Sequence, residues 1–278
     1  MASTADKRRV FRELHQSGCF VIPNPWDVGS ARYLKSQGFK ALATTSAGAA
    51  WAMGYADGGT PREEMLAHIR SIVEATDLPV NADYEGAHAH EPAAVAEGVR
   101  LCVDTGVAGL SVEDFTNDRA KPLYPFDQAV ARVRAAREAI DKSGGDVLLV
   151  GRAEGLIRGV PDLDEMIRRL VAYANVGADC LYAPGISTRE QIAAVVKAVA
   201  PKPVNVLMGT PSPLTVKDLA ELGVRRISIG GSMARAAWGG FIRATKTIVE
   251  NGSFDGFKDA APSAEMNKLL SSYSRGLA

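Results

Sequence analysis

The stretch PVNADYE, residues 79–85, begins like a buried strand and ends on two carboxylates. Val80 and Ala82 are small and apolar, whereas Asp83 and Glu85 stand two positions apart where the apolar run stops. In a strand, this spacing points both side chains to the same side. Because like charges repel, the stretch predicts a strand end at which a positive charge lies between the two acids.

Seven other runs of similar length occur along the chain, and nearly all are rich in Val, Ile, Leu and Ala without alternating polar positions. Such runs are typical of parallel strands that are covered on both faces. The eight predicted strands lie within residues 19–27, 41–47, 79–85, 109–115, 147–154, 180–185, 203–209 and 226–231.

Amphipathic segments separate these runs, and several of them place a glycine directly before the next strand. Segments 28–39, 92–107, 163–179 and 215–224 follow this order of helix, glycine and strand, and glycine suits the turn that ends a helix. Repeated strand–helix units predict a parallel α/β fold. Eight units within about 230 residues favour a (β/α)8 TIM barrel over an open sheet, which more often has roughly five to seven strands.

Composition limits the domain organisation and the partners. No linker divides the chain, so a single barrel domain is expected over residues 1–278, with a helical extension from about residue 252. Lys plus Arg and Asp plus Glu each total 32, which leaves no net charge to attract nucleic acid or a charged membrane. The sequence shows neither a signal peptide nor the roughly 20 apolar residues of a membrane span, so a cytoplasmic location is expected.

Three acids from neighbouring predicted strands indicate a metal site, because the active site of such a barrel lies at the C-terminal ends of its strands. These acids are Asp83, Glu85 and Glu113, and Asp57 is available from the loop after the second strand. A hard divalent cation would offset their repulsion, and oxygen ligands suggest Mg²⁺ or Mn²⁺ rather than zinc. The alternative is that the acids pair with Arg152 or cap the helices that follow.

Anion binding is indicated at two further strand ends. The backbone of TSAG, residues 45–48, could cradle a carboxylate through its N–H groups, although a tight turn without a ligand is equally consistent with it. The following segment, residues 49–59, is expected to be a loop without a helix. Arg152 follows four apolar residues, and a charge at such a position is expected to meet an anion or one of the carboxylates.

Four segments together resemble the isocitrate lyase/phosphoenolpyruvate mutase superfamily. They are FVIPNPWDVGSARYLKSQGFKALATTSAG (20–48), VNADYEG (80–86), GLSVEDF (109–115) and VLLVGRAEGLIRG (147–159). The resemblance runs through roughly residues 20–245. It implies a Mg²⁺-dependent (β/α)8 barrel that acts on 2-oxo acids or their adducts, and that makes or breaks C–C or C–P bonds next to a pyruvate-type enolate. It also implies homodimers or homotetramers in which the last helix is exchanged between neighbours.

The resemblance assigns substrate contacts to specific positions. Ser46, Ala47 and Gly48 match the backbone cradle for the substrate carboxylate, and Arg152 matches the arginine that contacts substrate oxygens. Asn205, at the end of the seventh predicted strand, is expected to complete the substrate-binding set.

The metal ligands match the superfamily with one departure. Asp57 matches a carboxylate in the water shell of the metal, and we expect it to act with Arg152 in catalysis. Asp83 matches the second Asp of the D-x-D motif, and Glu113 matches the Glu of the "ED" segment. Asn81 stands where the first Asp of D-x-D is usual, and Glu85 is expected to supply the missing charge.

Two further departures argue against an isocitrate or methylisocitrate lyase. Residues 115–125 read FTNDRAKPLYP and lack the catalytic cysteine of the K-K-C-G-H loop, and Pro184 stands near the position at which those lyases carry a Glu. We therefore expect a Mg²⁺-dependent lyase or decarboxylase of a small 2-oxo acid, with residues 115–125 as a gate. C–P chemistry of the phosphonopyruvate hydrolase or phosphoenolpyruvate mutase type and a non-catalytic 2-oxo acid-binding protein are the alternatives. Tyr84, His88 or a metal-held water would protonate the enolate.

Overall fold

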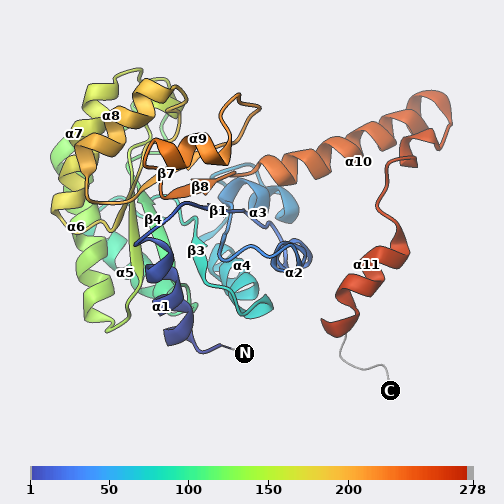
Figure 1. Cartoon of the computed structure of the whole chain (residues 1–278), viewed down its shortest axis with the longest axis horizontal. Coiled ribbons are helices and arrows are strands. Elements are labelled where there is room, and N and C mark those ends of the chain that lie inside the picture. The colour runs from blue at the N-terminus through green and yellow to red at the C-terminus, as the bar shows by residue number, and fades with distance from the viewer. Residues whose placement is uncertain (1, 274–278) are drawn as a thin grey trace.

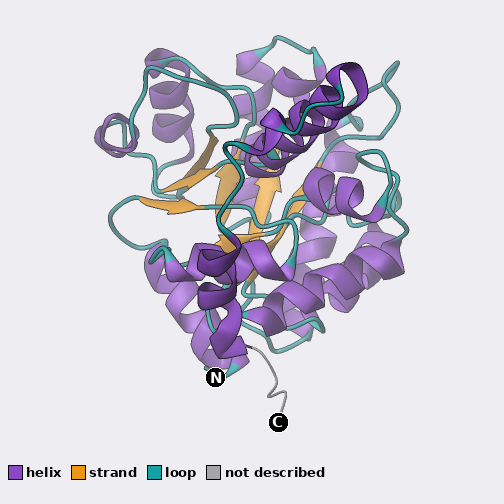
Figure 2. Ribbon diagram, turned by 90° about the vertical axis from the view of Figure 1, so that its right-hand side faces the viewer, coloured by secondary structure: helices purple, strands orange, loops and turns teal. Residues whose placement is uncertain are grey.

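The computed structural model describes residues 2–273, in which eight parallel strands are surrounded by helices (Figures 1 and 2). Each strand lies inside one of the eight runs predicted from the sequence, so the predicted (β/α)8 architecture is confirmed. The strands are β1 (Phe20–Ile22), β2 (Leu42–Ala43), β3 (Val80–Ala82), β4 (Gly109–Glu113), β5 (Leu148–Arg152), β6 (Cys180–Tyr182), β7 (Val204–Leu207) and β8 (Arg226–Ser228).

The sheet curls into a nearly closed barrel. From β2 to β8 each strand pairs in parallel with the next, and β8 pairs with β1 so that Phe20 lies opposite Arg226. The described residues of β1 and β2 form no ladder, but the Ala43 N–H donates to the carbonyl oxygen of Pro23 at 3.0 Å. The C-terminal ends of all eight strands therefore meet at one mouth, as the location of a shared site requires.

Amphipathic helices bury their apolar faces on the outside of the barrel. These helices are α2 (Val28–Ser36), α4 (Arg62–Ala75), α5 (Pro92–Val103), α6 (Phe126–Lys142), α7 (Leu163–Asn175), α8 (Arg189–Val199) and α9 (Val216–Glu221). At the opposite end from the mouth, α1 (Thr4–Leu14) inserts the fully buried Phe11 against Ile22 and Leu148. The interior below the mouth is thus a packed core rather than a channel.

The prediction of a helix-free segment over residues 49–59 was wrong, because helix α3 spans Ser46–Met53. The Thr45 side chain caps this helix by accepting the N–H of Gly48 at 3.2 Å. The helix ends at Gly54, whose φ of 85° suits a residue without a side chain. Alanine-rich composition and these two caps outweigh the turn character that the small residues suggested.

The C-terminal part of the chain leaves the barrel. Helix α10 (Ser232–Asn251) begins at the mouth and projects away from it, and the chain then turns back so that α11 (Ser263–Leu270) contacts α2 (Figure 1). Ala234 is the buried residue of α10, whereas Phe241 is 61% exposed and Val249 is 78% exposed. None of the helices within residues 2–273 combines the length and the apolar character that crossing a bilayer requires.

Candidate active site

A cavity of about 230 Å³ lies at the C-terminal ends of the strands, and eight charged residues contribute to its wall. It is smaller than the roughly 300 Å³ at which pockets for drug-sized ligands begin, so it suits a small acid. Its charged lining residues are Asp57, Asp83, Glu85, Glu113, Glu154, Arg152, Arg158 and Arg226.

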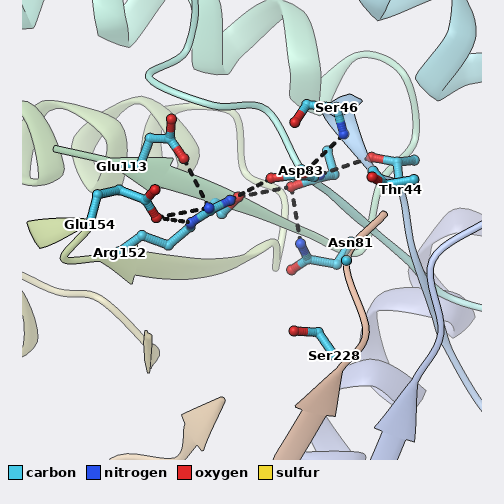
Figure 3. Close-up of polar contacts among 12 residues, drawn as sticks. Thr44, Ser46, Asn81, Asp83, Glu113, Arg152, Glu154 and Ser228 are labelled. Atoms are coloured by element: carbon cyan, nitrogen blue, oxygen red, sulfur yellow. Dashed lines mark hydrogen bonds and ion pairs between the residues drawn. The ribbon is translucent and has the colours of Figure 1, made fainter. Parts of the chain in front are cut away.

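Arg152, at the end of β5, bonds three carboxylates at once (Figure 3). Its Nη1 lies 2.5 Å from Asp83 Oδ1, and its Nη2 lies 3.1 Å from Glu113 Oε2 and 2.8 Å from Glu154 Oε1. Burial tends to lower the pKa of Arg152, but the three carboxylates outweigh burial and raise this pKa well above its usual value. The positive charge between the acids is therefore a guanidinium, as the alternative from the sequence had it.

Asp83 connects this cluster to the start of α3. Its Oδ2 accepts the backbone N–H of Ser46 at 2.9 Å, and its own N–H donates to Thr44 Oγ1 at 2.9 Å (Figure 3). A carboxylate at the first turn of a helix is also favoured by the helix dipole. Asp83 thus fixes Arg152 of β5 and the N-terminus of α3 relative to each other.

A second buried network positions Glu154 beside Arg152. Asp114 Oδ1 accepts the Glu154 N–H at 2.8 Å, and its Oδ2 accepts from Arg169 Nη1 at 3.0 Å and from the Tyr173 hydroxyl at 2.7 Å. The side chain of Asp114 is 2% exposed, so these bonds act away from solvent. Such fully satisfied buried networks hold a backbone in one arrangement.

The three residues of the expected cradle differ in what they offer a ligand. The N–H of Ser46 is bonded to Asp83, and that of Gly48 is bonded to Thr45 Oγ1. The hydrogen bonds within residues 2–273 include none from the N–H of Ala47, which lies in the first turn of α3. Ser46 and Ala47 line the cavity and Gly48 does not, so the open donor of the cradle is Ala47.

The remaining predicted acids lie around the same cavity. Glu85 is buried, and burial together with Asp83 and Asp57 raises its pKa to about 7. Asp57 is exposed at the mouth, 3.5 Å from Ser46 Oγ, and its pKa is raised by partial desolvation and by Asp83. Burial also raises the pKa of Glu113 well above its usual value, although Arg152 opposes this shift. The wall therefore holds more negative charge than its arginines offset.

The charge and chemistry of this wall can be compared with the needs of a divalent cation. Five carboxylates and three guanidinium groups line the cavity, so five negative and three positive charges leave a formal excess of two negative charges. This excess and the all-oxygen donor set fit one hard dication such as Mg²⁺. Within residues 2–273 no three acids are already grouped as ligands, since Arg152 stands between Asp83 and Glu113. The cavity wall thus fits a divalent cation in its charge and in its type of donor atom.

Several residues named from the sequence do not line the cavity. Asn205 is buried in β7, where its Nδ2 donates to Ser228 Oγ at 2.9 Å and its Oδ1 accepts from Arg226 Nε at 2.8 Å. Tyr84 is fully buried and His88 also lies outside the cavity. Neither side chain is placed to protonate a bound enolate.

Sequence reasoning missed Arg226 and underrated the first residues of the expected gate. Arg226 and Ser228 alternate in β8, and both side chains line the cavity. This alternation was the signal in the sequence, but Arg226 is the first residue of the predicted strand 226–231, and site residues were sought at the C-terminal ends of the strands. From the expected gate, Phe115 and Asn117 line the cavity, and the Arg158 guanidinium lies 3.7 Å from the centre of the Phe115 ring.

Comparisons with known proteins agree with this geometry. A solved structure of a Burkholderia cenocepacia protein, described as a lyase/mutase, is 45% identical with a TM-score of 0.92, and the alignment covers 96% of each chain. The oxaloacetate decarboxylase of Paraburkholderia xenovorans is 30% identical over 82% of this chain and 76% of its own. Oxaloacetate acetylhydrolase in complex with oxalate is 26% identical with a TM-score of 0.85, over 97% of this chain and 95% of its own.

The model of the phosphoenolpyruvate phosphomutase family matches residues 11–249, which contain the barrel and every charged residue of the cavity. The strand order, the position of the cavity and the family match thus all support the same family assignment. The chain belongs to the phosphoenolpyruvate phosphomutase family, within the isocitrate lyase/phosphoenolpyruvate mutase superfamily.

Proposed function

We propose that this protein is a Mg²⁺-dependent lyase that decarboxylates or cleaves a small 2-oxo dicarboxylic acid of the oxaloacetate type. The observation that carries the proposal is Arg152, whose side chain is 13% exposed and is held by Asp83 and Glu113 beside the N-terminus of α3 in a cavity sized for a small acid. Oxaloacetate decarboxylase and oxaloacetate acetylhydrolase, both similar to this chain, support the same class of substrate.

The residues of the chain would have different roles in binding and catalysis. The Ala47 N–H and the positive end of α3 bind the carboxylate next to the oxo group, because a helix N-terminus favours an anion. Arg152 lies against the oxo oxygen and offsets negative charge there. When the C–C bond breaks, its electron pair passes into the enolate and carbon dioxide leaves, and a proton from water then adds to the enolate carbon to give the 2-oxo acid product. Phe115 and Asn117 at the wall reduce access of water to the enolate.

A bound Mg²⁺ would act as a Lewis acid that draws charge from the oxo and carboxylate oxygens. Asp83, Glu85 and Glu113 would hold it, with Asp57 in its water shell. These residues contribute the excess negative charge of the cavity, which is what makes them suited to the ion.

Turnover of oxaloacetate tests the proposal. We expect Mg²⁺-dependent release of pyruvate above the spontaneous rate, with loss of activity in EDTA. Replacing Asp83 with alanine should lower kcat/KM by about 100-fold or more and weaken Mg²⁺ binding measured by calorimetry, since the ligand and the clamp on Arg152 are lost together. Full activity and Mg²⁺ affinity in Asp83→Ala would show that the metal assignment is wrong.

The family match favours C–P chemistry as a second candidate. Incubation with phosphonopyruvate separates the two, since phosphate release or conversion to phosphoenolpyruvate without turnover of oxaloacetate would replace the lyase proposal. Binding of 2-oxo acids without turnover of any of them would identify a non-catalytic binding protein.

The projecting helix α10 supports a homodimer or homotetramer in which this helix packs against a neighbouring copy. Phe241, Val249 and the 69%-exposed Phe254 are large apolar side chains in contact with solvent in the single chain, and such patches mark protein–protein contacts. We expect light scattering to give at least a dimer mass. The double variant Phe241→Glu/Val249→Glu should lower this mass, and Lys142→Glu on α6 should not. A monomeric wild-type protein would contradict the assignment.

A further inference from the structure

Arg226 of β8 is a buried cation without an ionic partner. The residue is 3% exposed and lines the cavity. Its Nε donates to Asn205 Oδ1 at 2.8 Å and its Nη1 to Asn81 Oδ1 at 3.3 Å. Both partners are neutral amides. Within residues 2–273, no carboxylate approaches the Arg226 guanidinium within 4.0 Å, and no hydrogen bond leaves from its Nη2.

This arrangement contrasts with that of Arg152 in the same cavity. Both guanidinium groups stay protonated at ordinary pH values, but Arg152 has three carboxylates as counter-ions, whereas Arg226 has none within 4.0 Å among the described residues. A buried charge without a counter-ion is costly to maintain. An anion that enters the cavity would supply the missing counter-charge and a partner for Nη2.

The identity of residue 81 as an asparagine leaves the Arg226 guanidinium without a counter-ion. Asn81 pairs with Gly109 of β4 in the barrel, and its side-chain oxygen faces the Arg226 guanidinium. An aspartate at position 81 would have the same shape but would place a carboxylate 3.3 Å from Nη1 and form a buried ion pair. The amide orients the guanidinium without neutralising it.

We propose that Arg226, with Asn81 and Ser228, forms an anion subsite on the β8 side of the cavity, which binds the second carboxylate of a dianionic 2-oxo acid. The subsite adds a second substrate contact to the proposed function, and the identity of the substrate rests on that proposed function. The first carboxylate lies near Ala47 at the start of α3, which follows β2, whereas Arg226 lies on β8, and β1 separates these two strands around the barrel. A monoanion such as pyruvate occupies the α3 end alone.

Binding measurements test the subsite without turnover. The affinity of the protein for malonate and for pyruvate is measured by calorimetry with Mg²⁺ present. Arg226→Met should weaken malonate binding by about 10- to 100-fold, the value of one charge-assisted hydrogen bond, and pyruvate binding by less than about 3-fold. Asn81→Asp, which changes no volume, should weaken malonate binding in the same way. Arg225→Met is the matched control, because Arg225 bonds the carbonyl of Gly18 outside the cavity.

The two variants keep the proposal open to refutation even if one of them folds poorly, which thermal unfolding would reveal. Unchanged malonate affinity in either folded variant would overturn the subsite. Tighter malonate binding in Asn81→Asp would also overturn it, because the new carboxylate would then serve a metal instead of neutralising Arg226. If malonate binding depends on Arg226 but no 2-oxo acid is turned over, the proposed function fails and the subsite stands.

Discussion

Replacing Arg152 with methionine is expected to lower kcat/KM by about 100- to 1,000-fold and the free energy of unfolding by about 3–5 kcal/mol near pH 8. The substitution leaves Asp83, Glu113 and Glu154 facing one another without their shared cation. Two of these side chains, Glu113 and Glu154, are no more than 5% exposed, so water cannot replace the guanidinium. Activity falls because the same group would offset charge on the substrate.

The pH dependence of this variant identifies the cause of its instability. Carboxylates without a cation have folded-state pKa values raised above those of the unfolded chain. A raised carboxyl pKa does not lower the free energy of unfolding below the unfolded-state pKa of about 4.3. The free energy of unfolding falls as the pH rises from there toward the folded-state pKa. Urea unfolding should therefore show a smaller loss for Arg152→Met at pH 5 than at pH 8. An equal loss at both pH values would point to packing instead of charge.

The matched control is Arg168→Met. Arg168 also pairs with a carboxylate, that of Glu165 at 2.6 Å, but its side chain is 54% exposed. A surface ion pair contributes at most about 1 kcal/mol, so this variant should stay close to wild type in stability and activity. A comparable loss in both variants would contradict the special position of Arg152.

Replacing Glu85 with glutamine should have the opposite effect on stability. In the absence of Mg²⁺ we expect the free energy of unfolding to rise by about 2–3 kcal/mol at pH 8, because the pKa of about 7 for Glu85 lies above its ordinary value. This raised pKa means that wild-type stability is lost as the pH rises from about 4.5 to 7. The glutamine does not titrate, so the difference between the two proteins should nearly vanish at pH 4.

Urea unfolding across this pH range measures the effect, and Glu63→Gln is its control. Glu63 lies on α4 with a 72%-exposed side chain, so its replacement should change stability by no more than about 0.5 kcal/mol. The backbone φ of 50° at Glu85 is unchanged by the substitution and cancels from the comparison. A Glu85→Gln variant that is less stable than wild type at pH 8 would show that the carboxylate is stabilised by contacts other than those described.

Local sequence patterns predicted the eight strands but missed one helix. An apolar run without polar alternation indicates a strand buried on both faces, and each of the eight runs contains one. Helix α3 was missed because Ser46–Met53 contains small residues that suit turns as well as helices. Its caps, Thr45 and Gly54, were present in the sequence and would have indicated both ends.

The sequence alone also placed seven of the predicted site residues at the cavity wall, because strand ends of a parallel barrel meet at one edge whatever their partners. These seven are Ser46, Ala47, Asp57, Asp83, Glu85, Glu113 and Arg152. Tertiary structure decided which of them touch. The register of β4 and β5 brings Glu113 beside Arg152, and the joining of β8 to β1 carries Arg226 toward Asn81. Contacts between distant segments depend on register and closure, and no local pattern encodes these.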